Sequence, residues 1–158
     1  MHEIIENASL EMTNVLTFRG KVTQQQFIQI NKEMNELIHS NNAQKVMKGV
    51  SATFSIDSSA EVPVMDIEIM YPLDKVISVT DPYIIKPVFR LRNAVKIRHT
   101  GDPSTIQNTA NEVMQYIKEK DLMPITAGYN VTVQEPANPT DVSSLIIDIY
   151  IGVSDNIL

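Results

Sequence analysis

The sequence predicts an α+β fold built from two consecutive strand–helix–strand–strand (βαββ) units. Several segments alternate apolar and polar residues, which is typical of strands that bury one face. Others carry apolar residues at helical spacing. The order of these segments recurs once, at an offset of about 79 residues in the 158-residue chain. Two such units usually form an antiparallel sheet with pseudo-two-fold symmetry, with two helices on one face and a cleft on the other.

The first repeated element is a strand, expected over residues 10–19 and again over residues 89–98. In both segments every second residue is apolar, except for an asparagine at the same point of the apolar face, Asn14 and Asn93. Buried amides are hydrogen-bonded in folded proteins. We therefore interpret each asparagine as bonded to the backbone at a strand irregularity, with contact to a ligand as the alternative.

The second repeated element is a helix, expected over residues 23–39 and 103–120. Thr23 and Pro103 each follow a turn that contains glycine, at a position suited to the start of a helix. Apolar residues then recur on one helical face. They are Phe27, Met34 and Ile38 in the first helix and Ile106, Val113 and Ile117 in the second.

Two further strands complete each unit, and each second strand is preceded or opened by a glycine, at residues 49 and 128. The third strands contain residues 68–73 and 148–153. Residues 75–86 are predicted to form an ordered crossover between the units, because they lack glycine and contain few serines. Residues 134–140 are predicted to form a surface loop. The chain is thus expected to be a single domain, residues 1–158, made of units at about 10–74 and 89–155.

Strand alternation assigns the side chains of the open sheet face. The isoleucines of the third strands need the core beneath the helices, so the residues between them must point the other way. Glu68, Asp148 and Tyr150 should therefore lie on the open face with exposed carboxylates, and Arg92 near its middle. The same face should also carry Glu11, Asp66, Arg90, Lys96 and Arg98.

Two interpretations of this polar face stay open. It is either a solvated sheet surface with weak cross-strand ion pairs, or a cleft for a polar ligand. In the second case the carboxylates would contact a cation, the arginines would hold an anion and the ring of Tyr150 would support a cationic or aromatic ligand.

The composition of the chain argues against several classes of function. The chain has no cysteine, which removes disulfides and thiol catalysis and fits a reducing compartment. Its formal net charge of −6 and its lack of tryptophan argue against general nucleic-acid binding. No apolar run is long enough for a membrane span, and the first residues do not resemble a signal peptide, so we expect a cytoplasmic protein.

No catalytic or cofactor motif is recognisable among the five glycines, and the three histidines have no metal-ligand spacing. We expect neither a metal nor a cofactor. His99 ends the apolar face of its strand and is interpreted as a capped or half-buried residue. Glu68 and Asp148 could in principle form a catalytic carboxylate pair. The chain lacks the aromatic platforms that a sugar would need, so we favour a protein that is not an enzyme.

The tandem βαββ plan and the segment Asp66-Ile67-Glu68-Ile69, followed by Tyr71-Pro72-Leu73, resemble the gyrase-inhibitor-like (SOUL-related) effector-binding domains. In that family this position commonly reads acid, apolar, Glu, apolar and ends in proline. Asp148 matches a cleft glutamate that pairs with cationic ligands. The likeness extends from about residue 10 to residue 153. The family's ligand cage is aromatic and often contains tryptophan, which this chain lacks.

The resemblance implies a stand-alone, non-enzymatic module that binds a small effector, cationic or aromatic, through Glu68, Asp148, Tyr150 and Arg92. No helix-turn-helix segment accompanies it, so we do not expect a complete transcription regulator. From the acidic net charge and the lack of a long apolar run we expect neither a nucleic-acid nor a membrane partner; a homodimer or a protein partner is left open. The sequence also resembles small proteins encoded beside type VII secretion genes. That weaker likeness implies an alternative function, a protein-interaction or adaptor protein in a secretion system.

Overall fold

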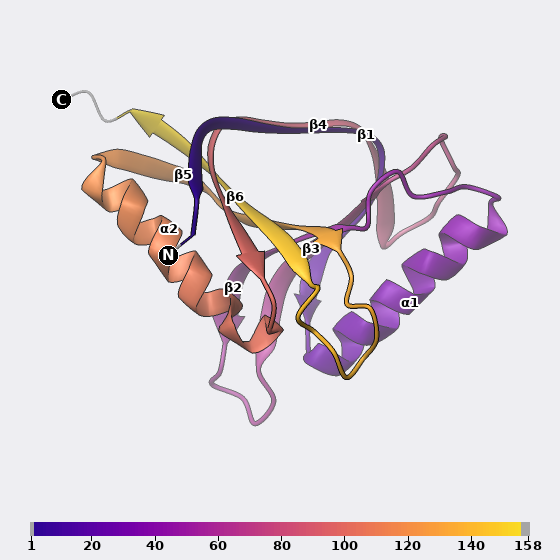
Figure 1. Ribbon diagram of the computed structural model, residues 1–158. Coiled ribbons are helices and arrows are strands. Elements are labelled where there is room, and N and C mark those ends of the chain that lie inside the picture. The colour runs from indigo at the N-terminus through magenta and orange to yellow at the C-terminus, as the bar shows by residue number, and fades with distance from the viewer. Residues whose placement is uncertain (1, 156–158) are drawn as a thin grey trace. The chain divides into compact units, whose positions relative to one another are not determined.

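The computed structural model describes residues 2–155. It is a mixed α+β structure with six strands, all of whose pairings described below are antiparallel, and two α-helices (Figure 1). In chain order the elements are β1 (Ile4–Val22), α1 (Gln24–Ser40), β2 (Val50–Asp57), β3 (Val64–Pro72), β4 (Tyr83–Thr100), the short 3₁₀ helix η1 (Pro103–Thr105), α2 (Ile106–Glu119), β5 (Leu122–Gln134) and β6 (Ile146–Asp155).

The chain divides into two compact units. The first, here called the N-terminal unit, is Met12–Phe89; the C-terminal unit combines the residues up to Glu11 with those from Arg90 onward. In the N-terminal unit β3 lies between β1 and β2. In the C-terminal unit β6 lies between β4 and β5. Each unit therefore has its last strand in the middle of three.

The first helix begins where the sequence predicted, whereas at the predicted start of the second, Pro103, the structure has η1, and α2 itself begins at Ile106. Thr23 is the N-cap of α1 and forms a capping box with Gln26, each side chain accepting a hydrogen bond from the backbone of the other residue. Before α2, the side chain of Asp102 accepts a hydrogen bond from the backbone N–H of Ser104 and caps η1. Neither α-helix among residues 2–155 is long and apolar enough to cross a membrane.

Each helix packs on one face of the strands in its own unit, and this confirms the predicted faces. In the N-terminal unit Met34 and Ile38 of α1 share a core with Ile67 and Ile69 of β3. In the C-terminal unit the core combines apolar residues of the helix with those of β4 and β6. They are Val113 and Ile117 from α2, Val95 and Ile97 from β4, and Ile149 and Ile151 from β6.

Three predicted strand boundaries were wrong. β1 begins at Ile4, β4 at Tyr83 and β5 at Leu122, each about six residues before the predicted start. Residues 83–86, predicted as part of the crossover, therefore belong to β4. In the early part of β1 most side chains are exposed or half-buried, so the apolar alternation that identifies a strand is weak there.

Asn14 and Asn93 both occupy the left-handed region, each with a φ angle of 53°. Asparagine tolerates this conformation better than most residues. The side-chain amide of Asn93 donates to the carbonyl oxygen of Val153 at 3.0 Å, which confirms the predicted backbone bond for this residue. The irregularity interrupts the alternation of β4, because Ala94 and Val95 are consecutive and both fully buried.

Gly152 offers a test of packing in the C-terminal unit. A Cβ atom there would lie 2.8 Å from Cγ2 of Thr126 and 2.9 Å from Cδ1 of Leu91. We expect Gly152→Ala to lower the free energy of unfolding by about 1–3 kcal/mol, the usual cost of overpacking. Urea unfolding measures this, with Gly128→Ala as the control, because a Cβ there meets only ordinary contacts, the nearest at 3.5 Å. Equal stability of the two variants would contradict the prediction.

Candidate functional site

Glu68 is the most buried acidic side chain of the N-terminal unit, with a relative exposure of 5%. It lies between the core residues Ile67 and Ile69 of β3, so its carboxylate points away from α1. Its Oε2 accepts a hydrogen bond from Nζ of Lys86 at 2.7 Å. The same ammonium lies 5.7 Å from the ring centre of Phe89, within cation–π range. Glu68, Lys86 and Phe89 are called the Glu68 cluster below.

A second ion pair of the N-terminal unit joins β3 to β1. Arg19 of β1 donates to Asp66 of β3 through Nε at 2.9 Å and Nη2 at 3.1 Å. The guanidinium also stacks 3.6 Å from the ring centre of Phe54. These hydrogen bonds from Arg19 are the main reason that the pKa of Asp66 lies below its ordinary value. Arg19 is half-exposed, so this pair contributes little to stability.

Asp148 is the corresponding buried acid of the C-terminal unit, with a relative exposure of 3%. It lies directly opposite Arg98 in the pairing of β4 with β6. Nε of Arg98 donates to Oδ1 at 2.7 Å and Nη2 to Oδ2 at 3.0 Å, which makes a bidentate pair. Nζ of Lys96 is 3.4 Å from Oδ2 and 5.6 Å from the ring centre of Tyr150. These four residues are called the Asp148 cluster.

The electrostatics of Asp148 combine opposing influences. Burial is the largest of them and acts to raise the pKa of the carboxyl group. The hydrogen bonds from Arg98 and the positive charges of Lys96 and Arg98 together outweigh it, so the pKa of Asp148 lies below its ordinary value of 3.8. Asp148 is therefore ionised at neutral pH despite its burial.

The structure brings two of the four predicted site residues together. Asp148 and Tyr150 both contact Lys96 and so belong to one cluster. Arg92 lies elsewhere on β4, with an exposed side chain whose Nε is 3.5 Å from Oε1 of Glu11. The alternation that grouped Arg92 with the residues after it is interrupted at Asn93, which lies between them.

The expected exposure of the two carboxylates was wrong. Glu68 and Asp148 are both nearly inaccessible to solvent. Alternation correctly turned them away from the helices, but a side chain on that face is exposed only if nothing covers it. Lys86 was also missed as a partner of Glu68, because residues 83–86 were assigned to the crossover. The strand-forming residues Ile84, Ile85 and Val88 around it are the signal that could have extended the strand.

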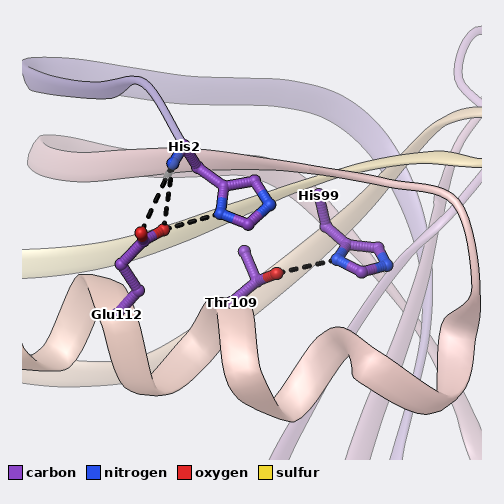
Figure 2. A network of polar contacts seen from close by, with 4 residues as sticks. All are labelled: His2, His99, Thr109 and Glu112. Carbon is purple, nitrogen blue, oxygen red and sulfur yellow. Dashed lines mark hydrogen bonds and ion pairs between the residues drawn. The ribbon is translucent and has the colours of Figure 1, made fainter.

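His99 has a structural role in the C-terminal unit. Its ring nitrogens have hydrogen-bond partners, in agreement with the predicted capped histidine. The residue is more fully buried than predicted, with 2% exposure. Its Nδ1 lies 2.8 Å from the hydroxyl of Thr109 and its Nε2 2.9 Å from the carbonyl oxygen of Asp102. Figure 2 shows the contact of His99 with Thr109 beside the contact between His2 and Glu112. Nδ1 of His2 lies 2.6 Å from Oε2 of Glu112. The two imidazole rings are stacked, with centres 6.4 Å apart. Among residues 2–155 no group of acidic or histidine side chains could hold a metal ion.

Each unit has an open pocket that is lined by its own residues. One, of about 480 Å³, lies in the N-terminal unit beside α1 and includes Glu33 and Tyr83. The hydroxyl of Tyr83 donates to Glu33 at 2.5 Å, and burial followed by this bond raises the pKa of the tyrosine. The other, of about 450 Å³, lies beside α2 and includes His2 and Glu112. None of the four predicted site residues lines either pocket.

No protein-family model matches the chain, and comparison with curated proteins gives no significant match. Solved structures do match. The C-terminal domain of EcmrR superposes with a TM-score of 0.73 at 14% sequence identity, over 99% of both chains. Against EcmrR in its complex with DNA the TM-score is 0.76 at 15% identity, and this chain spans 58% of the length of that protein.

Two further structures are less similar. A hydrolase from Listeria innocua has a TM-score of 0.56 at 15% identity, over 97% of this chain and 91% of its own. SAV2435, solved bound to tetraphenylphosphonium, has a TM-score of 0.53 at 12% identity, over 98% of this chain and 94% of its own. At these identities the likeness shows the fold alone. It is consistent with the resemblance to gyrase-inhibitor-like effector-binding domains, and it gives no support to a link with secretion.

Proposed function

We propose that this chain is a non-enzymatic module that binds a small cationic or aromatic effector through Glu68, Asp148, Tyr150 and Arg92. The observation that carries the proposal is the presence, in each unit, of a buried carboxylate with a positively charged partner and a neighbouring aromatic ring. A buried carboxylate attracts an organic cation strongly in low dielectric, and an aromatic ring binds the same cation through its face.

The fold supports the same proposal by analogy. EcmrR carries this fold beside a part that this chain does not match, and SAV2435 was solved with a lipophilic cation. We extend the proposal to the architecture: one domain of two pseudo-symmetric βαββ units, with the ligand cleft on the face opposite the helices. A cytoplasmic location fits the absence of cysteine from the sequence.

A thermal-shift screen of the whole chain against lipophilic cations, aromatic dyes and acidic metabolites tests the function. We expect lipophilic cations to raise the melting temperature, because a ligand at about 100 times its Kd stabilises the native state by about 2.7 kcal/mol. The hits should bind Glu68→Gln more weakly in calorimetry. Glu11→Gln is the matched control, because the carboxylate of Glu11 is half-exposed.

Two outcomes would contradict the proposal. If no small molecule stabilises the chain and a protein partner does, the adaptor function is favoured. Turnover of an activated ester that disappears in Glu68→Gln would instead assign a hydrolase.

A further inference from the structure

Lys86 already occupies the two groups of the Glu68 cluster that would recognise a cationic ligand. Its ammonium is 2.7 Å from Oε2 of Glu68 and 5.7 Å from the ring centre of Phe89. These are the contacts that an organic cation seeks, a carboxylate and an aromatic face. Lys86 forms an ion pair with Glu68, and Arg19, which lies opposite Glu68 in the pairing of β1 with β3, binds Asp66.

The Asp148 cluster differs in one respect. Lys96 lies similarly between a buried carboxylate and the ring of Tyr150, at 3.4 Å and 5.6 Å. However, Arg98 holds both oxygens of Asp148 at 2.7 and 3.0 Å. Removal of Lys96 would therefore leave Asp148 neutralised by Arg98, whereas removal of Lys86 would take away the ammonium that is hydrogen-bonded to Glu68.

We propose that Lys86 is an internal counter-cation that a cationic ligand must displace from Glu68, and that it sets the specificity of this site. The inference rests on the proposed function. A tethered ammonium competes at a high effective concentration. A ligand that offers only a positive charge gains nothing over it, so the site selects cations that add aromatic or apolar contacts.

The burial of the two side chains permits the exchange. Glu68 lies on β3, and only 6% of its side chain is exposed. The longer side chain of Lys86 is 31% exposed. A lysine stem can keep apolar contact while its ammonium turns into water. The lysine can therefore leave without disturbing β3, and the carboxylate stays in place for the ligand.

The first test is Lys86→Met, which keeps the length of the side chain and removes its charge. The probe is tetraphenylphosphonium, with triphenylphosphine oxide as the neutral control, and calorimetry gives the Kd. We expect the Kd for the cation to fall at least about tenfold, as for a newly unpaired buried charge. The Kd for the neutral control should change less than about twofold, within the scatter of a non-electrostatic contact.

Lys32→Met, at an exposed lysine of α1 that belongs to neither cluster, is the matched control, and its Kd for the cation should change less than about threefold. The double variant Lys86→Met with Glu68→Gln removes both charges and should lose the gain. An unchanged or higher Kd for the cation in folded Lys86→Met overturns the role of Lys86.

A second test uses the unaltered chain, so it does not depend on the folding of a variant. Acetylation of each lysine is followed by mass spectrometry with and without saturating tetraphenylphosphonium. We expect Lys86 to react faster when the cation is bound, because its ammonium is released, while exposed Lys21 keeps its rate. No acceleration at Lys86 in a chain that binds the cation overturns the inference and leaves the proposed function standing. If no small molecule binds either the unaltered chain or Lys86→Met, both fail.

Discussion

Replacing Asp148 with alanine is expected to lower the free energy of unfolding by about 3 kcal/mol. Loss of one partner of a buried ion pair usually costs about 3–5 kcal/mol. The lower end applies, because Arg98 is half-exposed and can regain hydration. Urea unfolding at pH 7 measures the change. Arg92→Ala is the control, because both side chains of the Arg92–Glu11 ion pair are exposed. We expect this variant to change the free energy of unfolding by less than about 0.5 kcal/mol.

The same carboxylate should make stability depend on pH. The folded pKa of Asp148 lies below its ordinary value of 3.8. Its contribution is therefore fully present above that value and is lost as the pH falls through the lowered folded pKa. Unfolding free energies of the unaltered chain and of Asp148→Asn, measured from pH 7 down to pH 2, should converge in the acid range. A constant difference between the two curves would contradict the assignment.

The sequence predicted the helices well because their signals are local. A threonine cap, a glutamine three residues later and a stripe of apolar residues lie within one helix, and all three are present in α1. The starts of β1 and β5 were missed because their first side chains are mostly exposed or half-buried, which leaves little alternation to recognise. The start of β4 was missed although Tyr83 and Ile85 contribute to the core of the N-terminal unit, because the segment was assigned to the crossover. Their identity depends on pairing with residues far away in the sequence.

The site was predicted in part for a similar physical reason. Alternation identified which side of β3 and β6 carries Glu68 and Asp148, because their isoleucine neighbours need the core. It could not show that both carboxylates are buried, which depends on residues brought from elsewhere. The left-handed backbone at Asn93 also separated Arg92 from Lys96, and a two-residue period cannot represent such an interruption.

The burial of Glu68 changes what its mutation should do. An exposed carboxylate there would have left stability almost unaltered, but the residue is buried, with 5% exposure, and its carboxylate is hydrogen-bonded to Lys86. We expect Glu68→Ala to lower the free energy of unfolding by about 1–3 kcal/mol, the range for a lost hydrogen bond to a charged group. Glu11→Ala, at an exposed ion pair, should change it by less than about 0.5 kcal/mol.

Binding separates the two roles that Glu68 can have. If its carboxylate contacts the ligand, Glu68→Ala should also weaken the binding of a lipophilic cation by about 1–3 kcal/mol. The affinity for a neutral analogue should stay the same, because only the cation loses a counter-charge. Calorimetry with both compounds measures this at a temperature where the variant is folded. A loss of stability with unaltered cation binding would mean that Glu68 serves only as the structural partner of Lys86. The polar face would then be an ion-paired sheet surface with no part in ligand binding.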